Sequence, residues 1–408
     1  MGHPARSTAH RLHKGLYVAA LLLGPSLSAL GQNAATQPQP DPIQSYLQPL
    51  VDNHTLSGAV VLVADRDSIL YLRGIGYRDI AAQASMPMNA MFWIASTSKP
   101  MTATAFMMLV DEGKVHLDDP VEEYLPEFEG QQVQVDQGAG QPPKLVPANH
   151  PVTIREILSH TSGLRFRSAK QPGALDLLSL KDQVRSFAAE PLLFQPGTNW
   201  QYSNEGLDTA ARILEVVTGI PYEQFMQQRL FDPLGMRDTA FSPNAEQISR
   251  LATSYEADPK THSVKAIPID QLTYPLSDHE RRFPMPAGGL FSTATDLSKF
   301  CRMILNGGTL NGRRFVSPEA IHEMTTRQND HLSSKGYGLG WSVSPGAAGH
   351  GGAYSNDMEI NFTNGRIFLF MVQQNGAWGT PAGDAMASTL EHIADQMIAA
   401  KEEAAHTR

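Results

Sequence analysis

Predicted hairpins at the two ends of the chain constrain its fold more than any other feature of the sequence. Near the N-terminus, residues 58–64 and 68–76 are two largely apolar runs separated by a short polar turn, which predicts two paired strands. Near the C-terminus, residues 357–363 and 366–374 flank Asn364-Gly365, a dipeptide typical of hairpin turns. Because helix signals dominate the sequence between the hairpins, we expect one sheet assembled from both ends of the chain.

The helix signals between the hairpins include starts and stops. Thr153 and Glu156 have the spacing of a capping box, in which each side chain accepts a backbone N–H of the other residue. Gly163 is the predicted stop of that helix. Further along, Gly219 followed by Pro221 indicates one helix ending and another beginning.

The fold class that these elements predict is α/β of the α+β type, an antiparallel sheet from both termini flanked by helices. Residues 41–120 and 285–405 should form the sheet region, which ends in a helix over about residues 381–400. Residues 121–284 should form an inserted, mainly helical region, in which residues 130–147 resemble a small exposed hairpin. A cleft where the two regions meet is the expected place for chemistry.

The N-terminus has the pattern of a secretory signal peptide. Positive charges precede a short apolar run at residues 16–23, and small residues end at Ala29-Leu30-Gly31. We therefore expect residues 1–31 to be removed and residues 32–40, which are polar and proline-rich, to form a tether. The sequence predicts an exported protein, periplasmic or secreted, with no stable membrane anchor after cleavage; a retained anchor is the alternative.

Charge and cysteine content exclude several classes of function. The formal net charge of −9 and the absence of clustered Lys and Arg argue against nucleic-acid binding. Cys301 is the single cysteine, so that an intrachain disulfide and a cysteine-based zinc cage are excluded. Its surroundings predict a small buried core residue. No metal or organic cofactor is implied by any motif in the sequence.

The segment Ser96-Thr97-Ser98-Lys99 opens a helix that has no charge between Lys99 and Asp111, which predicts burial on nearly all sides. Ser96 and Lys99 are three residues apart, so the lysine amine can reach the serine hydroxyl. Burial lowers the pKa of a lysine, which makes Lys99 a candidate base and Ser96 a candidate nucleophile. The alternative is a helix-capping Ser96 and a surface Lys99.

Tyr202 and Asn204 lie on a turn-rich loop that runs into the next helix. A tyrosine beside a buried lysine has its phenolate stabilised, so Tyr202 is a second candidate base. The amide of Asn204 can both donate to and accept from an amide substrate. In the alternative interpretation, Asn204 or Ser203 caps the helix and Tyr202 is a packing aromatic.

A glycine-rich strand containing His350 precedes the C-terminal hairpin. Gly351 and Gly352 would let the backbone approach a ligand closely, and His350 could donate to a substrate oxygen or polarise a neighbour; a simple turn is the alternative. His160, at the end of the capping-box helix, is expected to satisfy helix-end carbonyls rather than to take part in chemistry.

Taken in order, Ser-x-x-Lys, Tyr-x-Asn and His-Gly-Gly resemble the active-site pattern of serine β-lactamases and penicillin-binding proteins, nearest to the class C and D,D-carboxypeptidase branch. Similar family stretches are seen at residues 160–164, 288–293 and 337–341. The resemblance implies a β-lactamase/transpeptidase-like fold. It also implies that Ser96 is the nucleophile and that Lys99 and Tyr202 transfer protons. The residues that would bind the substrate are Asn204, His350, Gly351 and Gly352, and the backbone N–H groups of Ser96 and Ala353 would form the oxyanion hole.

The chain departs from the family pattern at His350, where most β-lactamases have the lysine of Lys-Thr-Gly. A histidine with an ordinary pKa near 6.5 is largely neutral at pH 7, which weakens the prediction of a dedicated β-lactamase. The sequence therefore predicts an acyl-Ser96 hydrolase of small esters or of D-amino-acid amides and peptides. A β-lactamase proper and a non-catalytic relative that binds cell-wall ligands or a partner are the alternatives, and either Lys99 or Tyr202 is the base.

Overall fold

The computed structural model describes residues 41–168, 175–258, 260–261, 263–375 and 385–406. These residues belong to one compact unit that begins at Asp41. The predicted signal peptide at residues 1–31 and the tether at residues 32–40 lie outside the described residues. In the part of the chain that is described, none of the helices combines the length and the apolar character needed to cross a bilayer.

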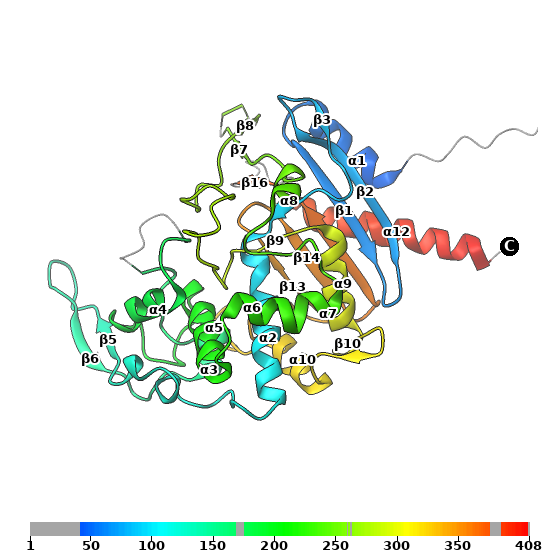
Figure 1. Cartoon of the computed structure of the whole chain (residues 1–408). Helices are drawn as coiled ribbons and strands as arrows, with labels where there is room; N and C mark the ends of the chain where they lie inside the picture. The colour runs from blue at the N-terminus through cyan, green and yellow to red at the C-terminus, as the bar shows by residue number, and fades with distance from the viewer. Residues whose placement is uncertain (1–40, 169–174, 259, 262, 376–384, 407–408) are drawn as a thin grey trace, which may run out of the picture. The chain divides into compact units, whose positions relative to one another are not determined.

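A seven-stranded antiparallel sheet forms the centre of the unit (Figure 1). Both ends of the chain contribute to it, as the sequence predicts, because β1 pairs with β2 on one side and with β15 on the other. In spatial order the strands are β12 (Ser342–Ser344), β13 (Ala347–Gly351), β14 (Asp357–Asn361), β15 (Arg366–Met371), β1 (Gly58–Ala64), β2 (Ile69–Asp79) and β3 (Ala84–Ser85).

Helices cover both faces of the sheet. In chain order they are α1 (Pro42–Asp52), α2 (Lys99–Asp111), α3 (Ile154–Ser159), α4 (Leu180–Ala188), α5 (Asn204–Thr218), α6 (Tyr222–Met226), α7 (Asp232–Leu234), α8 (Ala245–Ser249), α9 (Ala294–Leu305), α10 (Pro318–Thr325) and α12 (Met386–His406). A π-helical turn (Gln227–Phe231) joins α6 to α7. A 3-10 turn (Ala95–Ser98) leads into α2.

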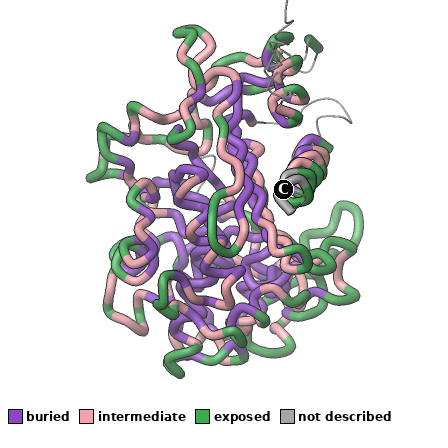
Figure 2. Tube along the Cα trace, turned by 90° about the vertical axis from the view of Figure 1, so that its right-hand side faces the viewer, coloured by how far each residue is buried: buried purple, intermediate pink, exposed green. Residues whose placement is uncertain are grey.

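The alternating directions of the side chains along β1 explain why the sheet lies between two layers of helices. Val61 and Val63 pack in one apolar cluster with residues of α1 and α12, whereas Val60 and Leu62 belong to a larger cluster on the opposite face. Successive side chains of a strand point to opposite faces, so a strand buried on both faces is apolar throughout, as β1 is. Figure 2 shows the buried positions concentrated in the interior and the exposed positions on the outer loops.

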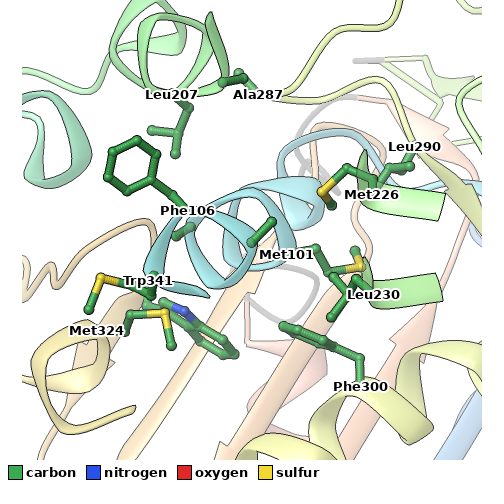
Figure 3. Packing of buried hydrophobic residues seen from close by; sticks show 14 of the residues in the cluster. Met101, Phe106, Leu207, Met226, Leu230, Ala287, Leu290, Phe300, Met324 and Trp341 are labelled. Carbon is green, nitrogen blue, oxygen red and sulfur yellow. The ribbon is translucent and has the colours of Figure 1, made fainter. Parts of the chain in front are cut away.

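Helix α2 lies at the centre of the larger cluster (Figure 3). Every residue from Lys99 to Leu109 is buried, as the uncharged sequence predicts. Apolar side chains from α5, α6, α9, α10 and the segment before β12 surround α2, among them Leu207, Met226, Phe300, Met324 and Trp341. The helix that carries the Ser-x-x-Lys motif is therefore held rigidly from all sides. Cys301, on α9, is buried in the same cluster, as expected.

Smaller strand pairs complete the fold. Residues 130–147 contain the predicted hairpin, formed by β5 (Gln132–Val135) and β6 (Lys144–Pro147). The other pairings are β4 (Phe92–Trp93) with β9 (Phe291–Ser292), β10 (Thr309–Leu310) with β11 (Arg313–Arg314), and β7 (Tyr255–Ala257) with both β8 (Val264–Ala266) and β16 (Gln374–Asn375).

Several boundaries differ from the sequence prediction. The strand predicted at residues 68–76 extends from Ile69 to Asp79, and the strand predicted at residues 357–363 ends at Asn361. The last strand of the C-terminal hairpin ends at Met371 instead of residue 374, because Gln374 leaves the main sheet to pair with β7. The capping box at Thr153 is formed as expected, but the helix ends at Ser159 and not at Gly163. His160 stops it by adopting a left-handed conformation with φ of 65°.

The contact between α3 and α5 depends on Gly206. A β-carbon at this position would lie 2.2 Å from the carbonyl oxygen of Ile157, well inside van der Waals contact. We therefore expect Gly206→Ala to lower the free energy of unfolding by about 1–3 kcal/mol, the usual cost of overpacking, and to displace Asn204 at the start of α5. Thermal melts and steady-state assays check both effects; an unchanged melting temperature would contradict the close packing.

Candidate active site

Ser96 lies on the 3-10 turn that precedes α2, one turn before the helix proper. The preceding residue, Ala95, has φ of 46°, a conformation that costs energy for a residue with a β-carbon and that clusters at functional sites. Ser98 stabilises the turn, because its Oγ donates to the carbonyl oxygen of Ala95 (2.6 Å) and accepts from the N–H of Leu290 (3.2 Å). The half-buried Ser96 side chain is thereby presented to a cleft.

Lys99 is fully buried and lies against the nucleophile candidate. Its Nζ is 3.1 Å from Ser96 Oγ, 2.8 Å from Asn204 Oδ1 and 2.7 Å from the carbonyl oxygen of Ala287. Burial lowers the pKa of Lys99 from its ordinary value to about 7, although the carboxylate of Asp208 acts in the opposite direction. A substantial fraction of the amine is therefore neutral near pH 7 and able to accept a proton.

Tyr202 lies above Lys99, with the lysine Nζ 4.8 Å from the centre of the tyrosine ring. Burial raises the pKa of Tyr202 above its ordinary value, while a hydrogen bond with Ser96 acts in the opposite direction. The phenol is therefore protonated at neutral pH. In the loop before α5, Ser203 is the helix cap and Asn204 is the first helical residue, so the Asn204 side chain is free to bind Lys99.

His350 lies on β13, opposite Lys99 and Tyr202. One ring nitrogen, Nδ1, lies 2.7 Å from the carbonyl oxygen of Gly351, to which it donates, and this leaves Nε2 as an acceptor. The hydroxyl of Tyr337 lies 3.1 Å from Nε2 and that of Tyr202 lies 3.5 Å from it. Of the two roles predicted for His350, polarising a neighbour fits this arrangement, whereas its one N–H is already occupied by Gly351.

A neutral His350 has a direct spectroscopic consequence. Burial disfavours the imidazolium ion and lowers the pKa of His350 to about 3, with the nearby Lys99 charge acting in the same direction. We expect the ring C–H signals of His350, assigned in NMR spectra by comparison with His350→Gln, to stay constant from pH 8 to pH 5. A titration with a midpoint near the ordinary value of 6.5 would contradict the buried, Tyr337-bound ring.

The cleft in front of Ser96 has a volume of about 380 Å³. All of the predicted site residues except Lys99 line it; Lys99 is fully buried and contacts the lining residues Ser96 and Asn204. The remaining lining residues are Trp93, Ala95, Phe166, Arg167, Leu175, Gln271, Met285, Ala287 and Gly288. Among the lining residues that the structure describes, Arg167 carries the permanent charge and none has a carboxylate. The cleft is therefore suited to a largely apolar ligand that is neutral or carries a negative charge.

Two backbone donors open into the same cleft. Gly352 lies so close to Ile94 that a β-carbon would be 2.5 Å from its carbonyl oxygen, and the hydroxyl of Thr97 donates to the carbonyl oxygen of His350 (3.3 Å). These contacts join β13 to the turn that carries Ser96. Among the described residues, neither the N–H of Ser96 nor that of Ala353 has a hydrogen-bond acceptor, so both are available to an incoming oxygen.

His160 has a different environment from the one expected from the sequence. The helix-end carbonyl of Glu156 is satisfied by the backbone N–H of His160 and not by its ring. The ring packs 4.6 Å from that of Tyr202 and 4.4 Å from that of Tyr337, and its Nδ1 accepts from the N–H of Ser203 (3.3 Å). His160 thus supports the loop that carries Tyr202 and Asn204.

Several residues of the site were not identified as such from the sequence. Tyr337 falls in the family-like stretch Tyr337-Gly338-Leu339-Gly340-Trp341, yet nothing local pairs it with His350. Asp208 had a detectable signal, because it places a carboxyl group on the face of α5 that also carries Leu207, Ala211 and Leu214, all of them buried. An acid on an apolar helix face requires a buried partner.

Comparison with known proteins gives matches over most of the chain. The family model described as Beta-lactamase matches residues 43–391. Protein Rv1367c of Mycobacterium tuberculosis is 33% identical over 366 residues, which cover 81% of this chain and 89% of that protein. Esterase EstB of Burkholderia gladioli is 30% identical over 317 residues, covering 70% of this chain and 74% of the esterase. The solved structure of EstCE1, described as a hydrolase with promiscuous acyltransferase activity, has the same fold, with a TM-score of 0.72 and 23% identity over 86% of this chain and 97% of that one.

Proposed function

Because the chain belongs to the beta-lactamase family of serine hydrolases, we propose that it is a carboxylic-ester hydrolase that works through an acyl intermediate on Ser96. The observation that carries this proposal is the 3.1 Å contact between Ser96 Oγ and the Nζ of the fully buried Lys99, at the floor of an apolar cleft. A buried amine beside a serine hydroxyl is the arrangement that activates a serine nucleophile. The relative EstB is named an esterase.

In the first half of the proposed reaction, Ser96 Oγ attacks the ester carbonyl carbon while its proton passes to Lys99 Nζ. The carbonyl oxygen becomes an oxyanion, which accepts hydrogen bonds from the N–H groups of Ser96 and Ala353. Collapse of this intermediate breaks the bond to the alkoxy group. That group leaves as the alcohol with a proton from Tyr202, whose hydroxyl is reprotonated by the Lys99 ammonium.

In the second half, a water molecule loses a proton to Lys99 and attacks the acyl carbon. The bond to Ser96 Oγ then breaks, and the Lys99 ammonium returns its proton to Ser96 Oγ as the acid is released. We assign the base to Lys99 and not to Tyr202. Burial pushes the pKa of the lysine down and that of the tyrosine up, so near pH 7 the amine accepts protons and the phenol donates them.

The lining of the cleft favours esters over β-lactams. The position of the usual lysine is occupied by His350, whose pKa is lowered by burial, so this strand supplies no cation for a substrate carboxylate. Trp93, Phe166 and Met285 give the cleft apolar walls. A second candidate, hydrolysis of D-amino-acid peptides, is favoured by Arg167, a permanent positive charge in the lining that could receive a terminal carboxylate.

A panel of substrates tests the proposal. Protein lacking residues 1–31 would be assayed with p-nitrophenyl butyrate, nitrocefin and a D-alanyl-D-alanine peptide. We expect kcat/KM for the ester to exceed both of the others by about 100-fold or more, the range over which differences in transition-state contacts discriminate substrates. A faster reaction with nitrocefin or the peptide would refute the ester assignment. Absence of any covalent adduct with a fluorophosphonate would refute the acyl-serine mechanism.

We further propose that the protein is exported and that residues 1–31 are removed, on the pattern of its N-terminus alone. Cell fractionation followed by N-terminal sequencing of the mature protein tests this proposal. A mature chain that begins at Met1, or that stays in the cytoplasm, would refute it.

A further inference from the structure

A carboxyl group lies behind the proposed base without lining the substrate cleft. Asp208 is on α5, one turn after Asn204, and its side chain is 1% exposed. It does not line the cleft and makes no ion pair within 4 Å in the described part of the chain. A buried carboxyl group must be compensated by hydrogen bonds, and those of Asp208 connect it to Lys99 through a third residue.

That third residue is Ala287. Asp208 Oδ1 accepts from the backbone N–H of Ala287 (2.9 Å), and the carbonyl oxygen of Ala287 accepts from Lys99 Nζ (2.7 Å). The other oxygen, Oδ2, accepts from Nε2 of Gln183 on α4 (2.9 Å), which fixes the plane of the carboxyl group. Asp208 therefore determines where one of the three acceptors of Lys99 lies.

The same helix supplies a second acceptor. Asn204, four residues before Asp208, accepts from Lys99 Nζ through Oδ1 (2.8 Å). Residues 285–289 form a tight turn, in which the N–H groups of Gly288 and Gly289 both donate to the carbonyl oxygen of Met285. The hydrogen bond that the N–H of Ala287 donates to Asp208 ties this turn to α5. Asn204 and Ala287 therefore hold the amine from two directions and leave Ser96 as its third partner.

From this geometry we propose that Asp208 is a positioning residue, which holds the Ala287 carbonyl, and through it the Lys99 amine, in place against Ser96. This inference rests on the proposed acyl-Ser96 mechanism and adds a residue to it. Asp208 touches neither the substrate nor the reacting atoms. Asp208 affects catalysis in two ways: it holds the backbone of Ala287, and its charge acts on Lys99.

The charge of Asp208 affects the protonation of Lys99. A nearby carboxylate stabilises the ammonium ion and so opposes the lowering of the lysine pKa by burial. Burial in turn raises the pKa of Asp208, against the bond from Ala287 and the charge of Lys99. The other titratable groups that interact with Asp208 are Glu205 on the same helix and Tyr222 on α6. Burial raises the pKa of both groups, that of Glu205 to about 8, so the neutral form of each predominates at pH 7.

Two substitutions separate the positional and electrostatic contributions. Asp208→Asn keeps an oxygen for the N–H of Ala287 and removes the charge. We expect its maximal rate to stay within about 3-fold of wild type, while the acid limb of kcat/KM moves to lower pH by about one unit, since the ammonium loses a stabilising charge. Asp208→Ala removes the acceptor as well, and we expect kcat to fall about 30-fold with little change in KM, as for a displaced catalytic group.

The rate of covalent labelling by a fluorophosphonate provides a readout that does not depend on the substrate. Asp208→Ala should label about 30-fold more slowly than wild type, and Asp208→Asn should restore the rate. Glu205→Gln is a matched control, because Glu205 is also a buried acid on α5 but binds the N–H of Arg165 and not the turn at Ala287. It should leave both the labelling rate and the acid limb unchanged.

The outcomes distinguish this inference from the proposed function. If wild-type protein is not labelled, the acyl-serine mechanism fails. If wild type is labelled and Asp208→Ala reacts at the same rate, the positioning role fails and the mechanism stands. If Asp208→Asn is as slow as Asp208→Ala with an unshifted acid limb, or Glu205→Gln reproduces the shift, Asp208 is merely structural and the inference is overturned. Should Asp208→Ala not fold, the shift of the acid limb in Asp208→Asn decides.

Discussion

Ser96→Ala is expected to lower kcat/KM by about 10⁴-fold or more and to abolish covalent labelling, because removal of the nucleophile removes the acyl pathway itself. Stability should change little. The contacts of the Ser96 hydroxyl are hydrogen bonds with Lys99 and Tyr202, and one hydrogen bond contributes about 1 kcal/mol. Mass spectrometry of the labelled peptide, together with a thermal melt of each protein, measures the two effects separately.

Ser98→Ala is the matched control for this experiment. Ser98 is fully buried in the same turn and binds the backbone of Ala95 and Leu290, but it does not line the cleft. We expect Ser98→Ala to behave in the opposite way to Ser96→Ala: its melting temperature should fall, and labelling at Ser96 should be retained. A label that survives Ser96→Ala, or that maps to Ser98, would refute the assignment of the nucleophile.

The sheet and the nucleophile helix were predictable because their signals are local. β1 is apolar at all seven positions, and the turn that follows it closes a hairpin within a few residues. The helix α2 is marked by a run of residues without charge. In both elements the same short segment determines the secondary structure and the degree of burial, so hydrophobic pattern alone was sufficient.

Apart from the contact between Ser96 and Lys99, which lie three residues apart, the partners within the site were not predictable, because they depend on how distant segments pack. His350 lies on β13, whereas Tyr337, whose hydroxyl contacts its ring, lies in the segment before β12. Asp208 and its partner Ala287 are 79 positions apart in the sequence. At His160, too, the sequence indicated a nearby helix end but not the contacts of the side chain. Its left-handed backbone is compatible with a helix end, whereas the direction of its ring is determined by Tyr202 and Tyr337. A local pattern determines that an element forms but not which side chain it contacts.

Lys99→Met is expected to lower kcat/KM by about 10³-fold, within the range attributed to a general base. Methionine fills a similar volume without an amine, so the surrounding core keeps its packing, while Ser96 loses its proton acceptor. A surface lysine provides the control: Lys114, which pairs with Glu112 at the far end of α2, should tolerate the same substitution without loss of activity.

The pH profile identifies Lys99 as the base more specifically than the loss of rate does. The amine accepts a proton only in its neutral form, so the activity of the wild type should fall as the pH is lowered through about 7, where burial places the pKa of Lys99. Tyr202→Phe should be slower than wild type but keep this acid limb, because burial raises the pKa of the phenol and leaves it protonated throughout. The residual activity of Lys99→Met should show no limb near pH 7. A limb that persists in Lys99→Met and disappears in Tyr202→Phe would transfer the role of base to the tyrosine.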